Sequence, residues 1–272
     1  MTPGNPDDRN GGGTAIRIAA MADLHCSKTN QGSLLPIFAA ASERADVLLL
    51  CGDLTDYGYP EEARNLVVEL APVKIPIIAV LGNHDYESGH ADEVKGILTD
   101  ARVQVLDGDG VEILGVGFAG VKGFGGGFGR RTLEPWGEEA TKAFVHEAVS
   151  EALKLESALA RLRTPQRIAV LHYSPIEGTV EGEPREIFPF LGSSRLEEPL
   201  NRYRVAAAFH GHAHRGAPEG RTSAGIPVYN VALPLLRRTL SEQLPLKIVE
   251  VLVSEPVGVS ESAPSRRRDD PQ

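Results

Sequence analysis

Aspartate, histidine and asparagine side chains recur in five short segments, each directly after a run of apolar residues. The segments are Asp23-Leu24-His25, Gly52-Asp53-Leu54-Thr55-Asp56, Gly82-Asn83-His84-Asp85, His172 and His210-Gly211-His212-Ala213-His214. Imidazole nitrogens with carboxylate and amide oxygens, and no thiolates, suit Mn, Fe, Zn, Ni or Co and disfavour an all-oxygen cage for calcium or magnesium. The candidate metal ligands are Asp23, His25, Asp53, Asn83, His172, His212 and His214. If Asp53 bridges two cations, each cation has four protein ligands.

Taken singly, any one of these histidines is explained without a binding site, as a hydrogen-bonded core or surface residue. The joint placement of five polar segments favours a site instead, because a binding site needs several groups to converge. In open α/β sheets, ligands bind at the carboxyl ends of the strands, which is where all five segments are expected.

The elements that must position these residues follow from apolar runs and helical periodicity. Buried strands are predicted at 16–21, 47–51 and 75–81, with helices at 34–44, 60–70 and 92–101. Runs at 103–106 and 111–114 flank Asp-Gly-Asp-Gly, which predicts a hairpin. A long helix is predicted at 140–162, and later strands at 168–171, 205–209, 226–231 and 247–252. Early parallel units and later antiparallel strands predict an α/β protein with two sheets packed face to face and helices outside.

Composition limits the other possibilities. The chain has 272 residues, of which 42% are hydrophobic, and its formal net charge is −9. This acidic balance disfavours stable nucleic-acid binding, and no apolar run is long enough for a membrane span. Two cysteines cannot build a disulfide framework, so a reduced cytoplasmic chain is expected. One domain is predicted over about 14–255, between a disordered leader at 1–13 and a disordered tail at 256–272, with the oligomeric state left open.

The five segments together resemble the complete motif set of the calcineurin-like metallophosphoesterases, in family order over residues 23–214. The resemblance implies a four-layer αββα sandwich of two mixed β-sheets and a binuclear metal centre. It implies one metal held by Asp23, His25, Asp53 and His214, and a second held by Asp53, Asn83, His172 and His212. His84 would face the substrate phosphate, and Asp56 would orient His84. Two divalent transition metals are expected, with manganese favoured.

Departures from the broad family narrow the expected substrate. Tyr57 and Asp85 stand where the phosphoprotein phosphatases of this family carry Arg and Glu, and this chain has the closing Gly-His-x-His that they lack. The chain therefore resembles the small bacterial phosphodiesterase-like branch. A water between two dications ionises near neutral pH, which would supply a hydroxide nucleophile. The expected activity is hydrolysis of a small nucleotide-like or lipid-like phosphodiester. A phosphomonoesterase and a non-catalytic metal-binding interaction scaffold are the alternatives.

A glycine-rich segment at 115–129 precedes Arg130 and Arg131. Its Gly-x-Gly-x-x-Gly spacing does not open a helix, so a dinucleotide site is not expected. One hypothesis is a mobile lid over the metal cleft in which Arg130 or Arg131 binds a substrate phosphate. The alternative is a structural excursion that covers the sheet edge.

Overall fold

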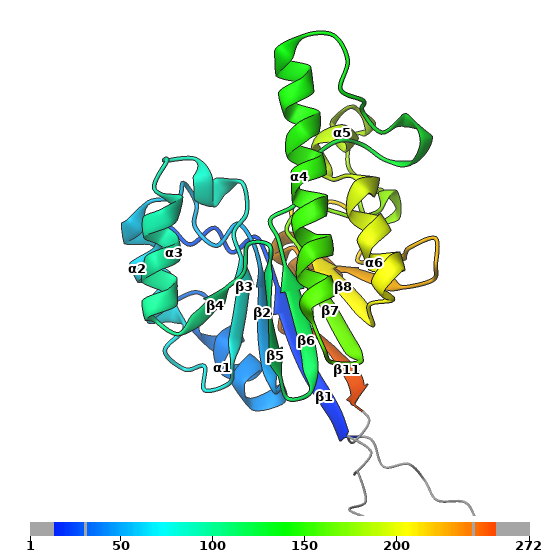
Figure 1. The fold of residues 1–272 in the computed structure, drawn as a ribbon. Helices are drawn as coiled ribbons and strands as arrows, with labels where there is room; N and C mark the ends of the chain where they lie inside the picture. The colour runs from blue at the N-terminus through cyan, green and yellow to red at the C-terminus, as the bar shows by residue number, and fades with distance from the viewer. Residues whose placement is uncertain (1–13, 30–31, 241–242, 254–272) are drawn as a thin grey trace, which may run out of the picture.

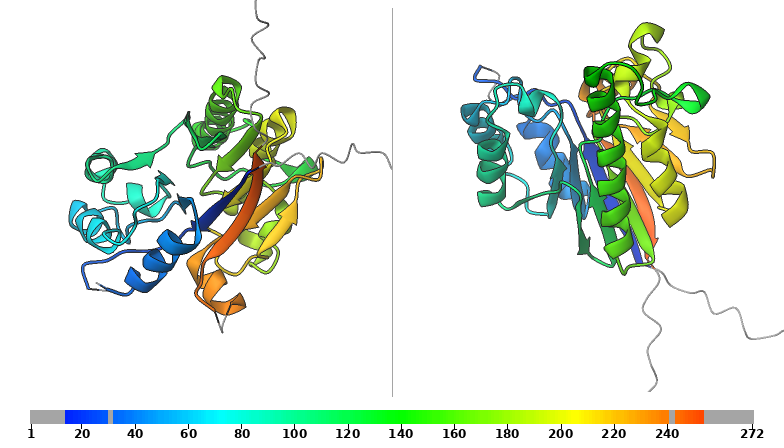
Figure 2. Two further views of the ribbon diagram at one scale, coloured as in Figure 1. Left: turned by 90° about the horizontal axis from the view of Figure 1, so that it is seen from below. Right: turned by 45° about the horizontal axis from the view of Figure 1, so that its top comes forward.

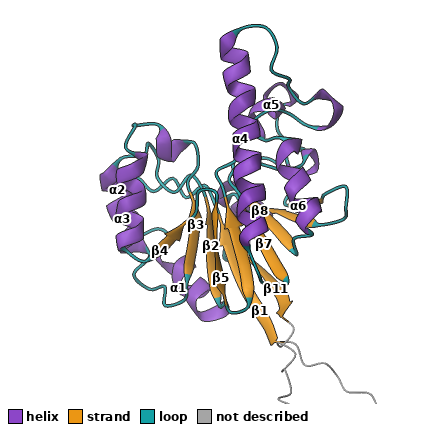
Figure 3. Ribbon diagram, viewed as in Figure 1, coloured by secondary structure: helices purple, strands orange, loops and turns teal. Residues whose placement is uncertain are grey.

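The computed structural model describes residues 14–29, 32–240 and 243–253. Two mixed sheets stand face to face, and helices cover both outer faces (Figure 1; Figure 3). Figure 2 shows the same layers from two further directions. The four-layer αββα sandwich expected from the sequence is confirmed. The predicted leader and tail lie outside the described residues.

The first sheet has the order β11-β1-β2-β3-β4. Its strands are β1 (Thr14–Met21), β2 (Val47–Cys51), β3 (Ile77–Val80), β4 (Val103–Val105) and β11 (Lys247–Val253). Strands β1 to β4 run parallel, and β11 pairs antiparallel with β1 at the edge. Parallel neighbours place the carboxyl ends of β1, β2 and β3 along one edge of the sheet, where the loops that follow them meet.

The second sheet has the order β5-β6-β7-β8-β10-β9. Its strands are β5 (Asp109–Ile113), β6 (Val116–Gly120), β7 (Gln166–Val170), β8 (Ala207–His210), β9 (Glu219–Arg221) and β10 (Pro227–Asn230). The four central strands are parallel, and only β5 and β9 pair antiparallel. The expectation that the later strands would be antiparallel is therefore wrong for the centre of this sheet.

The hairpin predicted around Asp-Gly-Asp-Gly is also wrong, because β4 and β5 belong to different sheets. The Leu106 amide donates to the Ala79 carbonyl of the first sheet, whereas the Gly108 amide donates to the Gly120 carbonyl of the second. Gly108 has φ +81°, a conformation in which glycine carries no Cβ penalty. The turn thus carries the chain from one sheet to the other.

Strand β2 shows why these apolar runs form the centre of the sandwich. Leu48 and Leu50 face one core, and Val47, Leu49 and Cys51 face another, so both faces of the strand are buried. A strand covered on both sides reads as a continuous apolar run rather than an alternating one. The first core packs against helices, and the second lies between the two sheets.

Helices complete the outer layers. They are α1 (Leu35–Arg44), α2 (Pro60–Glu69) and α3 (Ala91–Asp100) beside the first sheet, and α4 (Glu139–Arg161) and α6 (Glu197–Tyr203) beside the second, with α5 (Phe188–Leu191) and α7 (Leu233–Thr239) in later connections. Helix α4 matches the predicted long helix closely. None of the helices in the described part of the chain has both the length and the hydropathy of a membrane span.

Candidate metal centre

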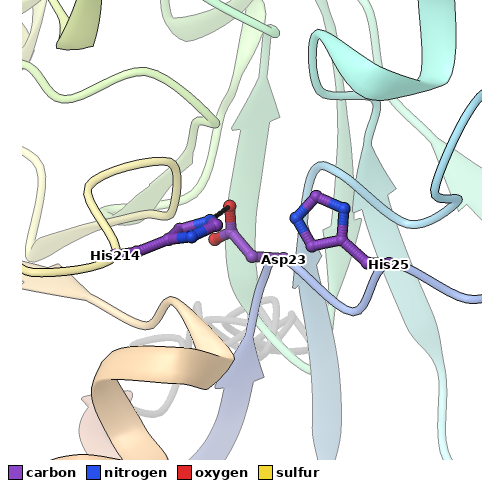
Figure 4. Close-up of side chains that lie close together, drawn as sticks. All are labelled: Asp23, His25 and His214. Carbon is purple, nitrogen blue, oxygen red and sulfur yellow. Dashed lines mark hydrogen bonds and ion pairs between the residues drawn. The ribbon is translucent and has the colours of Figure 1, made fainter.

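The loops after β1, β2, β3, β7 and β8 carry all seven predicted metal ligands. Three overlapping groups have ligand atoms within 4.8 Å of one another: Asp23 with His25 and His214, His25 with Asp53 and His84, and Asp53 with His172 and His212. Figure 4 shows the first group, in which Asp23 lies between the two imidazole rings. Because His25 occurs in the first two groups and Asp53 in the last two, the three groups are neighbours within one centre.

Individual distances show how tightly the donor atoms converge. His214 Nε2 lies 2.9 Å from Asp23 Oδ1, and His172 Nε2 lies 3.3 Å from Asp53 Oδ1. Asn83 Oδ1 lies 3.0 Å from His172 Nε2, which brings the asparagine to the same side as that histidine. The structure therefore brings together every residue that the sequence suggested as a metal ligand.

Three glycines allow this convergence because a side chain at their positions would collide with a ligand. A Cβ on Gly52 would lie 2.4 Å from the His172 ring, and one on Gly82 would lie 2.2 Å from Asp53 Oδ1. A Cβ on Gly211 would lie 2.3 Å from Asp23 Oδ2. Each glycine stands beside a ligand from a different loop, so the loops can approach to hydrogen-bond distance.

The backbone of four candidate ligands is left-handed, which is uncommon outside glycine. Asp23, His25, Asp53 and His212 have φ between 43° and 68°. Such conformations cost of order 1–3 kcal/mol each and concentrate at functional sites. Hydrogen bonds between loops hold them, including Asp23 N to Gly52 O and His25 N to Asp53 O.

The second ring nitrogen of two histidines has a hydrogen-bond acceptor, which selects the tautomer that can bind a metal. His172 Nδ1 lies 3.0 Å from the Cys51 carbonyl oxygen, and His212 Nε2 lies 3.1 Å from the Phe190 carbonyl oxygen. A carbonyl only accepts, so each of these nitrogens donates its proton. In the neutral ring that this contact selects, the lone pair lies on His172 Nε2 and on His212 Nδ1, where a cation would bind.

The contact between Asp56 and His84 runs through the main chain of Asp56. His84 Nδ1 lies 2.7 Å from the backbone carbonyl oxygen of Asp56, so the main chain rather than the carboxylate positions His84. The Asp56 carboxylate instead lies 3.4 Å from His25 Nδ1. The reason is local: Asp56 N donates to the Cys26 carbonyl, which draws Asp56 alongside His25.

Asp85 holds two of the ligand loops together, a role that the sequence analysis missed. Its buried carboxylate accepts hydrogen bonds from the Leu54 amide, the amide and hydroxyl of Thr55, and the Gly82 amide. The Asp53 loop and the Asn83 loop are thus joined through one side chain. In the sequence, the only indication of this role was the position of Asp85 directly after Asn83 and His84.

The surroundings of the candidate ligands leave most of them in the protonation state that binds a cation. Burial opposes ionisation of Asp53, but His172 lowers the pKa of Asp53 well below its usual range. Burial disfavours protonated His172, yet Asp53 outweighs it and raises the pKa of His172 to about 9. Burial lowers the pKa of His212 to about 4 and also lowers the pKa of His25. His212 and His25 are consequently neutral near pH 7, the form in which imidazole binds metals.

These residues fit a pair of divalent cations. The donors are imidazole nitrogens and carboxylate or amide oxygens, and the two aspartates, Asp23 and Asp53, are buried where a negative charge needs compensation. Both cysteines are buried, and burial raises the pKa of Cys26 to about 12, so neither supplies a thiolate. The donor set therefore suits divalent metal ions held by nitrogen and oxygen.

The glycine-rich segment lies within the fold. It begins as β6 and continues through residues that are mostly buried, held by hydrogen bonds such as Gly126 N to Pro189 O and Gly127 N to Gly192 O. These glycines permit close packing, which agrees with a structural excursion rather than a lid. Arg130 and Arg131 lie exposed just beyond it and are not among the grouped ligands.

The comparisons with known proteins agree with this geometry. A family model described as calcineurin-like phosphoesterase matches residues 16–216. The chain belongs to this family. Membership and the clustered histidines and aspartates together support a metal-dependent phosphoesterase. No curated protein matches the chain.

Two solved structures illustrate how the fold is shared. Phosphopantetheinyl hydrolase from Mycobacterium tuberculosis is 16% identical, with a TM-score of 0.61, and the match covers 91% of this phosphoesterase and 98% of that chain. The protein TT1561 of Thermus thermophilus is 14% identical, with a TM-score of 0.51, covering 88% and 99% of the two chains. At these identities the likeness establishes the fold alone.

Proposed function

We propose that this phosphoesterase hydrolyses a small nucleotide-like or lipid-like phosphodiester with two divalent transition metals bound, manganese being favoured. The observation that carries the proposal is the placement of Asp53 between two groups, one with His25 and His84 and the other with His172 and His212. A carboxylate with a group on each side can serve two cations at once. Paired cations are a recurrent device for phosphoryl transfer.

The residues divide into two ligand sets. Asp23, His25, Asp53 and His214 would hold one cation. Asp53, Asn83, His172 and His212 would hold the other. When bound, the two cations would supply Lewis-acid charge to a phosphoryl oxygen and acidify a water.

His84 is placed to act on the substrate itself. Its ring lies 4.6 Å from the His25 ring, edge to face, so it stands beside the metal ligands. Nδ1 donates to the Asp56 carbonyl, which leaves Nε2 to meet a substrate oxygen. A protonated His84 would stabilise charge on the phosphoryl group or give its proton to the leaving oxygen.

The test compares bis(4-nitrophenyl) phosphate with 4-nitrophenyl phosphate, using manganese-loaded protein before and after chelation. We expect faster hydrolysis of the diester, with loss of activity on chelation. Asp53→Ala and Asn83→Ala should abolish turnover. His84→Ala should lower turnover while metal content, measured by plasma mass spectrometry, is kept.

Each alternative has its own outcome in this assay. Preference for the monoester would identify a phosphomonoesterase and overturn the diester proposal. Metal binding without hydrolysis of either ester would favour an interaction scaffold. Loss of metal from the His84→Ala variant would contradict the division of roles between His84 and the ligands.

A further inference from the structure

A pocket of about 470 Å³ lies beside the N-terminal end of α5, and none of its lining residues is a candidate metal ligand. Its wall is built from the 3-10 helix η2 (Gly129–Arg131) and the segment that leads into α5. The lining side chains that matter here are Phe128, Arg130, Arg131, Glu177, Arg185 and Phe188. This volume falls in the range of small-molecule sites and exceeds what a bare inorganic ion needs.

The pocket gathers positive charge in a chain that is acidic overall. Its lining includes three arginines, Arg130, Arg131 and Arg185, and one acidic residue, Glu177. Within residues 14–29, 32–240 and 243–253, none of these three arginines forms an ion pair, whereas Arg17, for example, pairs with Asp46. Guanidinium groups bind phosphate and carboxylate oxygens through paired hydrogen bonds, so an anion is the ligand that this wall fits.

The apolar residues of the pocket belong to a cluster that reaches the loop carrying two candidate metal ligands. Phe128 and Phe188 pack with Ala213, which is fully buried between His212 and His214. Helix α5 provides a second link between the pocket and the metal centre, because the carbonyl of Phe190 in α5 accepts the hydrogen bond from His212. The residues that form the pocket are therefore linked to the loop of His212 and His214 by one packing contact and one hydrogen bond.

We propose that this pocket binds a second anionic group of the substrate, a terminal phosphate attached to an apolar or ring-containing body. The inference rests on the proposed function, because it places the scissile phosphate at the metal centre and the second phosphate among the arginines. It assigns Arg130, Arg131 and Arg185 to recognition of the substrate rather than to the reaction. Diesters that carry a second phosphate would then be better substrates than simple diesters such as bis(4-nitrophenyl) phosphate.

The first experiment measures binding without turnover. Phenyl phosphate is titrated into chelated protein by calorimetry, using the wild type, the double variant Arg130→Ala/Arg185→Ala, and the control Arg44→Ala/Arg237→Ala. The control removes two exposed arginines from α1 and α7, so the net charge changes equally. Because hydrogen bonds to charged groups are each worth about tenfold in affinity, loss of two arginines should weaken binding by at least about tenfold and by up to about 100-fold. Equal binding by the double variant, or no binding by the wild type, would overturn the proposal.

The second experiment tests the same pocket during hydrolysis by the manganese-loaded protein. The substrates are thymidine 3′-(4-nitrophenyl phosphate) and its 5′-phosphorylated form, which differ only in the terminal phosphate. The ratio of their kcat/KM values should be about ten or more in the wild type and control, and about one in the double variant. An unchanged ratio in the double variant would refute the proposal that the pocket binds the second phosphate.

The two experiments separate failure of the pocket from failure of the proposed function. Binding of phenyl phosphate that depends on the arginines, with no hydrolysis of either nucleotide, would refute the function and leave an anion site. Hydrolysis of both nucleotides at equal rates, with no phenyl phosphate bound, would refute the pocket and leave the function.

Discussion

Replacing Gly82 by alanine tests whether Asp53 has to lie where the structure places it. The added Cβ would lie 2.2 Å from Asp53 Oδ1 and 2.3 Å from Asp53 N, whereas ordinary contact begins at 3.4 Å. The Asp53 carboxylate must therefore move by about 1 Å, several times the tolerance of roughly 0.2 Å in metal–ligand distances. A displacement of this size commonly costs about 100-fold in rate.

The assay is manganese-dependent hydrolysis of bis(4-nitrophenyl) phosphate, with metal content measured in parallel. Gly96→Ala is the matched control, because Gly96 lies in α3 with nothing within 4 Å of the added Cβ. Removing a helical glycine should stabilise the control by about 0.5–1 kcal/mol. If Gly82→Ala kept wild-type activity and both metals, the position of Asp53 would not matter and the reasoning would be refuted.

Three further predictions concern stability. Asp85→Ala removes the acceptor of four buried donors, so the free energy of unfolding in urea should fall by at least about 3 kcal/mol; an unchanged midpoint would contradict this. Manganese at about 100 times its Kd should stabilise chelated protein by roughly 2.7 kcal/mol in thermal unfolding, and an equal effect on Asp53→Ala would argue against the site. Hydrogen bonds from Arg17 lower the pKa of Asp46, so their contribution is present above the unfolded pKa and is lost as pH falls through the folded one. The difference in Tm between wild type and Asp46→Asn should consequently be larger at pH 7 than at pH 3.

The central strands could be predicted because burial on both faces leaves an unbroken apolar run. Strand β2 was predicted with its observed bounds, and β1 and β3 within two residues of theirs. The hairpin was wrong because Asp-Gly-Asp-Gly specifies a turn and not the sheet that the chain enters next. The short helices α5, α6 and α7 were missed, since four to seven residues provide too few turns for a periodic pattern.

The metal centre was predictable at the level of residue type and position, and its supporting contacts were not. Each ligand lies in the loop that begins at the end of a strand, so the sequence order located the loops. The Phe190 carbonyl beside His212 and the Asp56 carbonyl beside His84 are main-chain atoms, and every residue carries one. Only the tertiary structure determines which carbonyl a ring nitrogen meets.

The strained backbone and the close glycines have a common explanation. A short loop that follows a strand must turn sharply to aim its side chain back over the end of the sheet, and the left-handed conformation of Asp53 achieves this within one residue. The same turn brings the Asp53 side chain and amide against Gly82. The strain persists because neighbouring loops brace it, as when Asp85 binds the amides on both sides of the gap. The fold therefore gives up stability at this edge to hold two buried carboxylates among imidazoles, an arrangement that burial alone would oppose and that a pair of cations would relieve.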